Sequence, residues 1–239
     1  MQTLTRKFRI RNPFNPDEHY AQEVLISDSP QYDYTDSTWV AIDTEFLTLK
    51  VPYDRLCTIQ IASPLPGNPQ LQRVEIIWVW EKLLSGDTKE LKDFLKSILK
   101  NKNLTILTHV FTADLTRLEL LAGVAAKCQA FDTKVAAKIV MTNTDYHGMD
   151  DLITSLVNPM FTKDRRVTSS QWDLHPSAWE DKMAEYAMND VIFLKPLQDR
   201  LTEMAERRGK LELLQDTMAI IPTISALYRS GYDERVLGY

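Results

Sequence analysis

The amino-acid sequence predicts an α/β fold from three observations. Apolar segments rich in β-branched residues, which predict buried strands, lie at residues 38–43, 56–62, 74–80 and 104–109. Amphipathic patterns, which predict helices, lie at residues 87–100, 113–123, 132–141, 149–157 and 177–210. The strands lie early in the chain and the helices lie between and after them, which is typical of a layered α/β architecture.

The first 36 residues differ from this pattern, because they are polar and contain Pro13, Pro16 and Pro30. We expect them to form an irregular extension wrapped on the domain. The segment TWVAID at 38–43 is continuously apolar up to its final acid, as in a strand buried on both faces. A proline-rich stretch at 64–69 marks a loop between the next two strands.

Local signals also delimit the helices. Asp87 is the expected N-cap of the helix at 87–100, and Gly123 ends the helix at 113–123. Pro196 predicts a kink in the long helical stretch. We therefore expect three parts, which are an N-terminal extension at 1–36, a catalytic domain at 37–210 and a helical tail packed on it at 211–239.

Composition excludes several classes of function. The chain has 239 residues, 44% hydrophobic and 26% charged, as in ordinary globular proteins. Its 7 glycines are too far apart for a G-x-G-x-x-G loop or a P-loop, so we expect no nucleotide cofactor. Cys57 and Cys128 form no C-x-x-C pair, which argues against thiolate zinc sites. No apolar run reaches about 18 residues and no signal peptide is evident, so we expect a cytoplasmic protein without a membrane span.

Three local patterns place acidic side chains at the ends of predicted elements. Asp43 and Glu45 lie two residues apart after a predicted strand and share one of its faces. Asp114 lies in the first turn of a helix that follows another strand, and Tyr186 and Asp190 share a helical face at i, i+4. Alone, each has an ordinary explanation, namely a solvated strand end, an acid favoured by the helix dipole or a surface pair.

Together, these four carboxylates and one tyrosine come from three elements at one edge of the predicted sheet, where α/β folds bind ligands. Hard oxygen ligands favour Mg²⁺ or Mn²⁺ over zinc. Four carboxylates beside a phenol suit two-metal phosphodiester hydrolysis. Two divalent ions offset most of the net charge of −5, so the acidic balance does not exclude a nucleic-acid substrate.

The motifs that carry these residues resemble those of the DEDD superfamily of 3′–5′ exonucleases, and ribonuclease D in particular. The matching segments are IDTEF at 42–46, RLCTIQIA at 55–62, HVFTADLTRL at 109–118, DTKVAAKI at 132–139, DYHGMDDLI at 145–153 and YAMNDVIFL at 186–194. The chain is similar to the tyrosine-bearing branch, because Glu185 stands where the histidine-bearing relatives place their histidine. Few residues follow the last motif, as in the short, single-domain members.

The resemblance implies an RNase H-like exonuclease fold, with a mixed five-stranded sheet flanked by helices. It implies that two divalent metal ions, Mg²⁺ or Mn²⁺, are bound by Asp43, Glu45, Asp114 and Asp190, and that Tyr186 orients the attacking water. Contacts with substrate are predicted for Thr44, Phe46, His109, His147, Arg165 and Arg166. Of these, Phe46 is a candidate to stack on a terminal base, and the two arginines, with nearby Lys163, are candidates for phosphate contact.

The activity implied is hydrolysis of RNA from a single-stranded 3′ end to nucleoside 5′-monophosphates, without a membrane partner. One alternative keeps the chemistry but acts on DNA ends in proofreading or repair. A second is a catalytically idle adaptor of the same fold that only binds nucleic acid, and a third is a structural metal-binding domain. The complete set of four acids argues against the idle adaptor, and Tyr186 is not explained by a structural metal site.

Overall fold

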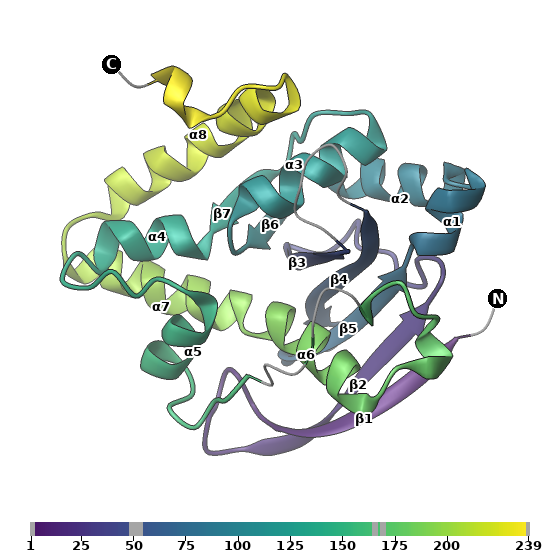
Figure 1. Ribbon diagram of the computed structural model, residues 1–239. Helices are drawn as coiled ribbons and strands as arrows, with labels where there is room; N and C mark the ends of the chain where they lie inside the picture. The colour runs from purple at the N-terminus through teal and green to yellow at the C-terminus, as the bar shows by residue number, and fades with distance from the viewer. Residues whose placement is uncertain (1–2, 48–54, 164–166, 168–170, 238–239) are drawn as a thin grey trace.

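The computed structural model describes residues 3–47, 55–163, 167 and 171–237. The strands found there are β1 (Leu4–Arg11), β2 (His19–Ser27), β3 (Trp39–Phe46), β4 (Leu56–Leu65), β5 (Asn68–Trp78), β6 (Thr105–Thr108) and β7 (Gln129–Asp132). Within these residues they form one mixed sheet of seven strands, in the order β1-β2-β5-β4-β3-β6-β7 (Figure 1). Within the sheet, β3 pairs antiparallel with β4 and parallel with β6.

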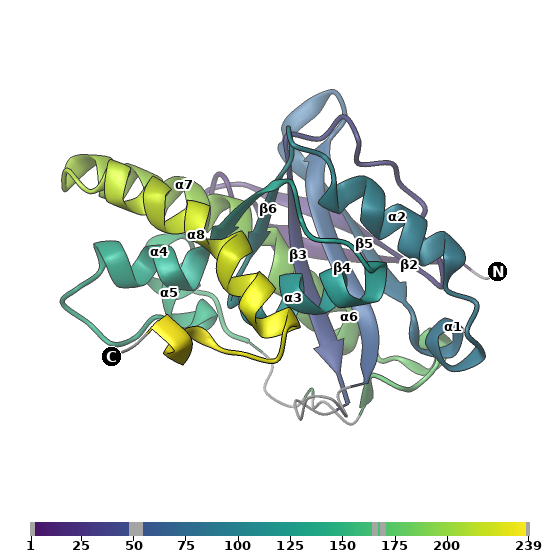
Figure 2. The ribbon, with the colours of Figure 1, turned by 90° about the horizontal axis from the view of Figure 1, so that it is seen from above.

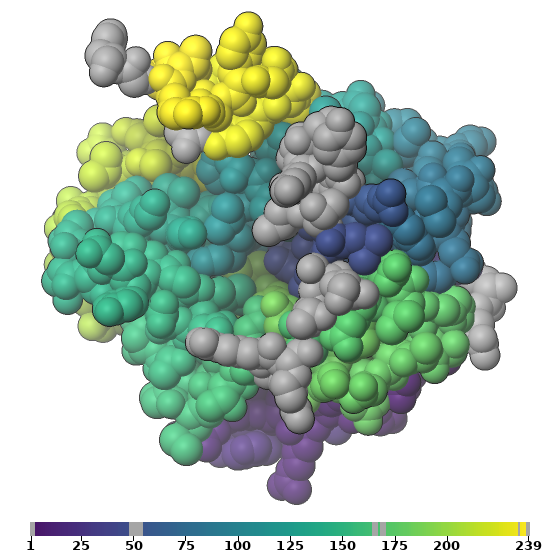
Figure 3. Space-filling model, viewed as in Figure 1, coloured from purple at the N-terminus to yellow at the C-terminus, as the bar shows by residue number. Residues whose placement is uncertain are grey.

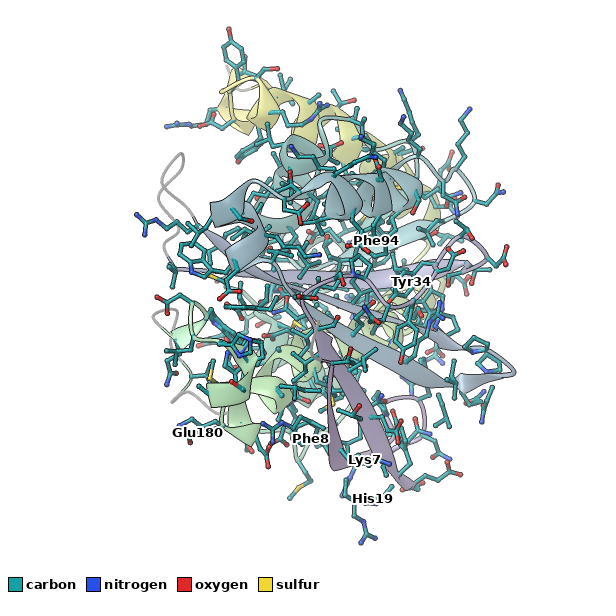
Figure 4. The ribbon with its side chains drawn as sticks, turned by 90° about the vertical axis from the view of Figure 1, so that its right-hand side faces the viewer. Lys7, Phe8, His19, Tyr34, Phe94 and Glu180 are labelled. Atoms are coloured by element: carbon teal, nitrogen blue, oxygen red, sulfur yellow. The ribbon has the colours of Figure 1, made fainter. Side chains whose placement is uncertain are left out.

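The N-terminal hairpin corrects two expectations, the irregular extension and the count of five strands. β1 and β2 pair antiparallel along their whole length, and β2 continues parallel to β5. Along β1, Leu4 and Phe8 are half-buried and Lys7 is exposed, an alternation that suits a strand with one solvated face. Pro13 and Pro16 fall between the strands, where they remove no ladder hydrogen bond. The hairpin, with Lys7, Phe8 and His19 labelled in Figure 4, thus adds two strands to the expected five.

The segment between β2 and β3 is also fixed to the body of the protein. The Tyr34 hydroxyl donates to the buried Glu75 carboxylate at 2.9 Å. The Tyr34 ring lies edge-on to Phe94, with 5.9 Å between ring centroids (Figure 4). The N-terminal residues are therefore packed into the domain through both the sheet and this link.

Helices cover both faces of the sheet (Figures 1 and 2). They are α1 (Trp80–Ser85), α2 (Lys89–Leu99), α3 (Phe111–Ala122), α4 (Thr133–Val140), α5 (Met149–Leu156), α6 (Asp181–Ile192), α7 (Leu194–Arg207) and α8 (Leu211–Arg229), with short 3-10 turns η2 (Pro176–Ala178) and η3 (Glu234–Leu237). α2 packs on α3, α6 crosses β3, β4 and β5, and α8 packs on α3 and β7. Among the described residues, no helix is both long enough and apolar enough to cross a membrane.

Some boundaries differ from the expectations. The predicted stretch 177–210 is divided into η2, α6 and α7, with α6 and α7 meeting at Phe193. Because Pro196 has no N–H to donate to the Ile192 carbonyl, that oxygen accepts instead from Gln72 Nε2 at 2.8 Å. Thr88 rather than Asp87 occupies the N-cap of α2, without a side-chain capping bond. The short α1 and β7 were not expected, since 6 and 4 residues carry little periodicity.

Candidate active site

The alternation of side chains along β3 sends its polar residues to opposite faces of the sheet. Thr44 and Phe46 point to the face covered by α3, where Thr44 contacts Asp114 and Phe46 lies under the Arg117 guanidinium. Asp43 and Glu45 therefore point to the other face, which α6 covers. The prediction that Asp43 and Glu45 share one face of the strand is confirmed.

Asp114 reaches the site from α3 and is held by β3. It lies in the first turn of α3 and is 2% exposed. The Thr44 hydroxyl donates a hydrogen bond to the Asp114 carboxylate. The bond fixes Asp114 beside the end of β3, and it gives Thr44 a positioning contact in addition to its place in the wall of the cavity.

Tyr186 and Asp190 reach the same place from α6. Carboxylate oxygens of Asp43, Glu45 and Asp190 all lie within 4.8 Å of one another. Tyr186 and Asp114 line a cavity of about 400 Å³ together with Asp43 and Glu45. In the space-filling view, dark blue residues near the ends of β3 and β4 are exposed between teal and green segments (Figure 3). The structure thus brings all five predicted catalytic residues together.

Lys163 adds a positive charge to the carboxylate cluster. Its Nζ lies 2.6 Å from Asp190 Oδ1 and 4.0 Å from the centroid of the Tyr186 ring. Both side chains of the ion pair are largely buried, with 16% of Lys163 and 8% of Asp190 exposed. The sequence predicted phosphate contact for Lys163 but not its ion pair with Asp190, because nothing in its local pattern shows that it lies against the acids.

Burial is the main cause of the pKa shifts in this cluster. It raises the pKa of Glu45 to about 8, of Asp114 to about 7 and of Asp190 to about 6. The pKa of Asp43 is raised well above its usual range by burial and then by the charges of its three acidic neighbours. Burial also raises the pKa of Tyr186 to about 12. Tyr186 is therefore a neutral hydrogen-bonding group at neutral pH.

Trp172 is a site residue that the sequence reasoning missed. Its side chain is 1% exposed, lines the cavity and hydrogen-bonds to the Glu45 carboxylate. Its ring also packs against Tyr186, with 6.0 Å between centroids. The indole N–H thus orients Glu45 and the ring supports Tyr186. A tryptophan beside acids in a polar segment, QWDL at 171–174, was the available signal.

The predicted substrate residues fall into three groups. Phe46 and His109 line the cavity, and the Arg117 guanidinium carbon lies 4.4 Å from the centroid of the Phe46 ring. His147 is not among the described residues that line it, and its Nε2 contacts the Met141 carbonyl at 3.1 Å, which closes the turn after α4. Arg165 and Arg166 lie outside the described residues. Substrate contact by these side chains remains a prediction.

The donor set fits a hard divalent cation. Three carboxylate oxygens converge within 4.8 Å, and a buried fourth carboxylate, that of Asp114, lines the same cavity and is a close charged neighbour of Asp43. Mg²⁺ and Mn²⁺ take oxygen ligands in this kind of arrangement, whereas structural zinc sites use cysteine and histidine. Among the described residues, no histidine or cysteine joins the group. The carboxylates thus suit the metals predicted from the sequence.

Comparison with known families agrees with this geometry. The family described as 3′–5′ exonuclease matches residues 26–206, which is more than half of the chain. The chain belongs to this 3′–5′ exonuclease family. The ribonuclease D of Jannaschia sp. (strain CCS1) is 27% identical over 188 residues, covering 79% of this chain and 45% of that protein. The ribonuclease D of Acidiphilium cryptum (strain JF-5) is 27% identical over 192 residues, covering 80% and 44%. This exonuclease-family chain therefore spans less than half the length of either relative.

Solved structures share the exonuclease fold. Brucella melitensis NrnC superposes with a TM-score of 0.70 and 27% identity, covering 89% of this chain and 92% of that chain. The same protein bound to pGG gives a TM-score of 0.69 at 28% identity, covering 90% and 93%. The structure of that protein with bound Mg²⁺ gives a TM-score of 0.68 at 27% identity, covering 89% of this chain and 92% of that chain. The predicted RNase H-like exonuclease fold and the ribonuclease D resemblance are confirmed, with seven strands among the described residues in place of the expected five.

Proposed function

We propose that this chain is a metal-dependent 3′–5′ exonuclease that hydrolyses RNA from a single-stranded 3′ end to nucleoside 5′-monophosphates. The observation that carries the proposal is the convergence of three carboxylate oxygens within 4.8 Å, beside Tyr186 and Asp114. Family membership and the names of the ribonuclease D relatives support it. The pGG-bound form of NrnC supports a short nucleic acid as the ligand class.

Each side chain has a distinct role in this proposal. Asp43, Glu45 and Asp190 would hold one divalent cation, and Asp43 with Asp114 would hold a second, either Mg²⁺ or Mn²⁺. When bound, such cations activate water and stabilise the leaving 3′ oxygen. Tyr186 orients the attacking water through its neutral hydroxyl, because a phenol with a pKa of about 12 is a poor free base.

Two side chains fit the substrate, Phe46 in the cavity wall and Lys163 against Asp190 and Tyr186. Phe46 presents an apolar ring on which the terminal base stacks. Lys163, which neutralises Asp190, carries the positive charge that a phosphodiester needs beside a cluster of acids. This positive charge favours the binding of a negatively charged substrate in a cavity that is otherwise acidic.

The test uses 5′-labelled single-stranded RNA and DNA of one sequence, with Mn²⁺, Mg²⁺ or EDTA. We expect a ladder that shortens from the 3′ end of RNA, needs the metal and stops at a 3′-phosphate. Preferential shortening of DNA would move the protein to the repair alternative. Binding without shortening would identify the idle adaptor, and cleavage of a circular RNA would exclude the exonuclease geometry.

A further inference from the structure

His109 stands in the wall of the cavity that contains the catalytic acids. It directly follows β6, its ring is half-buried, and it lines the cavity with Asp43, Asp114 and Tyr186. It does not join Asp43, Glu45 and Asp190 in the group whose ligand atoms lie within 4.8 Å of one another. It is therefore a neighbour of the metal-binding acids and not a member of their ligand set.

The hydrogen bonds of Thr133 favour one tautomer of His109. The Thr133 hydroxyl is placed to donate its single proton to the Thr108 carbonyl at 3.2 Å. His109 Nδ1 lies 2.8 Å from the same hydroxyl oxygen, and in this arrangement that oxygen accepts from Nδ1–H. A neutral imidazole protonated at Nδ1 has a lone pair at Nε2. No other described residue hydrogen-bonds to that nitrogen.

The backbone around His109 is held in a costly conformation. The next residue, Val110, has φ 74°, a left-handed conformation that is rare for a β-branched residue. The buried Asp132 carboxylate keeps this turn in place by accepting hydrogen bonds from Phe111 N at 2.5 Å and from Val135 N at 2.9 Å. Asp132 thus joins the turn after β6 to the start of α4, where Thr133 lies. Strain of this kind persists where the surrounding structure fixes it, and it is concentrated at functional sites.

The charge state of His109 excludes a role as a phosphate-binding cation. Burial, together with the charges of Lys134 and Lys163, lowers the pKa of His109 to about 4. The ring is therefore neutral at physiological pH. An acceptor nitrogen needs a donor as its partner, and ionised phosphodiesters carry no proton. The hydroxyl groups of ribose are the donors that every RNA end brings into this cavity, whatever its terminal base.

We propose that His109 Nε2 accepts a hydrogen bond from a ribose hydroxyl at the 3′ end of the substrate. The assignment rests on the proposed exonuclease function and adds a sugar-recognition role to it. Both the 2′-hydroxyl and the 3′-hydroxyl carry this chemistry, so the substrates of the test must separate them. His109 is in this view a specificity residue, and it bears on the choice between RNA and DNA.

The experiment measures kcat/KM for four RNA oligonucleotides that differ only in the terminal sugar, which is ribose, 2′-deoxy, 3′-deoxy or 2′,3′-dideoxy. For the wild type we expect a loss of about 10- to 100-fold on removal of the contacted hydroxyl, the usual effect of leaving a buried polar group unpaired. His109→Phe keeps a flat ring without an acceptor, and it should cleave all four substrates alike. His109→Gln supplies an acceptor oxygen and should restore part of the discrimination. The control is His19→Phe, because His19 is exposed on the N-terminal hairpin (Figure 4), and its preference should equal that of the wild type.

A second measurement does not depend on activity. Nitrogen-15 NMR of the imidazole side chains should show the His109 proton on Nδ1 in the wild type. Three results would each overturn the sugar contact while leaving exonuclease activity established. The first is a proton on Nε2, and the second is equal rates on all four substrates for an active wild type. The third is unchanged discrimination between the substrates in His109→Phe. Absence of cleavage of every oligonucleotide would instead refute the proposed function, and the sugar contact with it.

Discussion

Replacing Asp43 with asparagine tests the electrostatics of the carboxylate cluster. Because oxygens of Asp43, Glu45 and Asp190 lie within 4.8 Å of one another, each ionised pair repels by about 3.5 kcal/mol at an effective dielectric constant of about 20. The Lys163 ammonium, 2.6 Å from Asp190, already offsets the charge of that partner. The variant should therefore lose the cost of one pair, which the wild type meets at pH 8 either as repulsion between ionised carboxylates or as a proton held at a raised pKa. In EDTA at pH 8 we expect its free energy of unfolding to exceed that of the wild type by about 3 kcal/mol, or roughly 6–12 °C in Tm for a chain of this size.

Saturating Mn²⁺ should reverse this order. A ligand at about 100 times its Kd stabilises the native state by about 2.7 kcal/mol, and the wild type should gain at least this amount. Asp43→Asn should gain little, because it lacks a carboxylate that both proposed cations share. Thermal and guanidinium unfolding of both proteins, each in EDTA and in Mn²⁺, measure the crossover. Asp87→Asn, which removes an exposed carboxylate between α1 and α2, is the matched control and should follow the wild type.

Two results would refute the reasoning. If Asp43→Asn is no more stable than the wild type in EDTA at pH 8, repulsion in the cluster does not limit stability. If it gains as much as the wild type from Mn²⁺, Asp43 is not a metal ligand. RNA cleavage by Asp43→Asn above a tenth of the wild-type rate would also remove Asp43 from the mechanism.

The remaining predictions concern other groups of the same site. Tyr186→Phe should lower kcat by about 10²–10⁴-fold with little change in the Mn²⁺ concentration for half-maximal activity. Asp190→Asn should lose both rate and Mn²⁺ affinity. An equal loss of Mn²⁺ affinity in the two variants would mean that Tyr186 supports the metal site. Lys163→Met should lower the free energy of unfolding in EDTA at pH 8 by about 3 kcal/mol, because it leaves Asp190 buried without its partner, and unchanged guanidinium unfolding would contradict the ion pair. Burial raises the pKa of Glu45 to about 8, so the folded protein binds protons more tightly than the unfolded chain, and its free energy of unfolding in EDTA should fall as pH rises from about 5 to 8. Over the same range Mn²⁺ should bind more tightly in titration calorimetry, because the carboxylates lose their protons. A free energy of unfolding that rises with pH would refute this. Val110→Gly should be more stable than Val110→Ala by about 1 kcal/mol in urea, because only glycine adopts the left-handed conformation without cost, and the opposite order would show that the turn is relaxed.

Much of the fold was predictable because its signals are local. The apolar run before Asp43 predicts the central strand, and the amphipathic pattern at 87–100 predicts α2 to within two residues at its start. The N-terminal hairpin was missed although its residues alternate, because prolines nearby suggested an irregular segment. β7 was missed because 4 residues are too few to show a period.

Local spacing in the chain is enough to predict which catalytic groups share a face. The spacing i, i+2 in a strand places Asp43 beside Glu45, and i, i+4 in a helix places Tyr186 beside Asp190, whatever the rest of the chain does. Backbone geometry alone sets these relations, so they require no knowledge of the packing.

The way in which these pairs meet, and the groups that surround them, depend on contacts between distant parts of the chain. The Thr44–Asp114 bond joins residues 70 positions apart, and the Lys163–Asp190 pair joins residues 27 apart. Such contacts depend on how helices pack across the sheet and on the path of loops, which no local periodicity encodes. The same holds for the contact between His109 and Thr133 at the start of α4, because Thr133 reaches His109 only when β6 and β7 pair side by side.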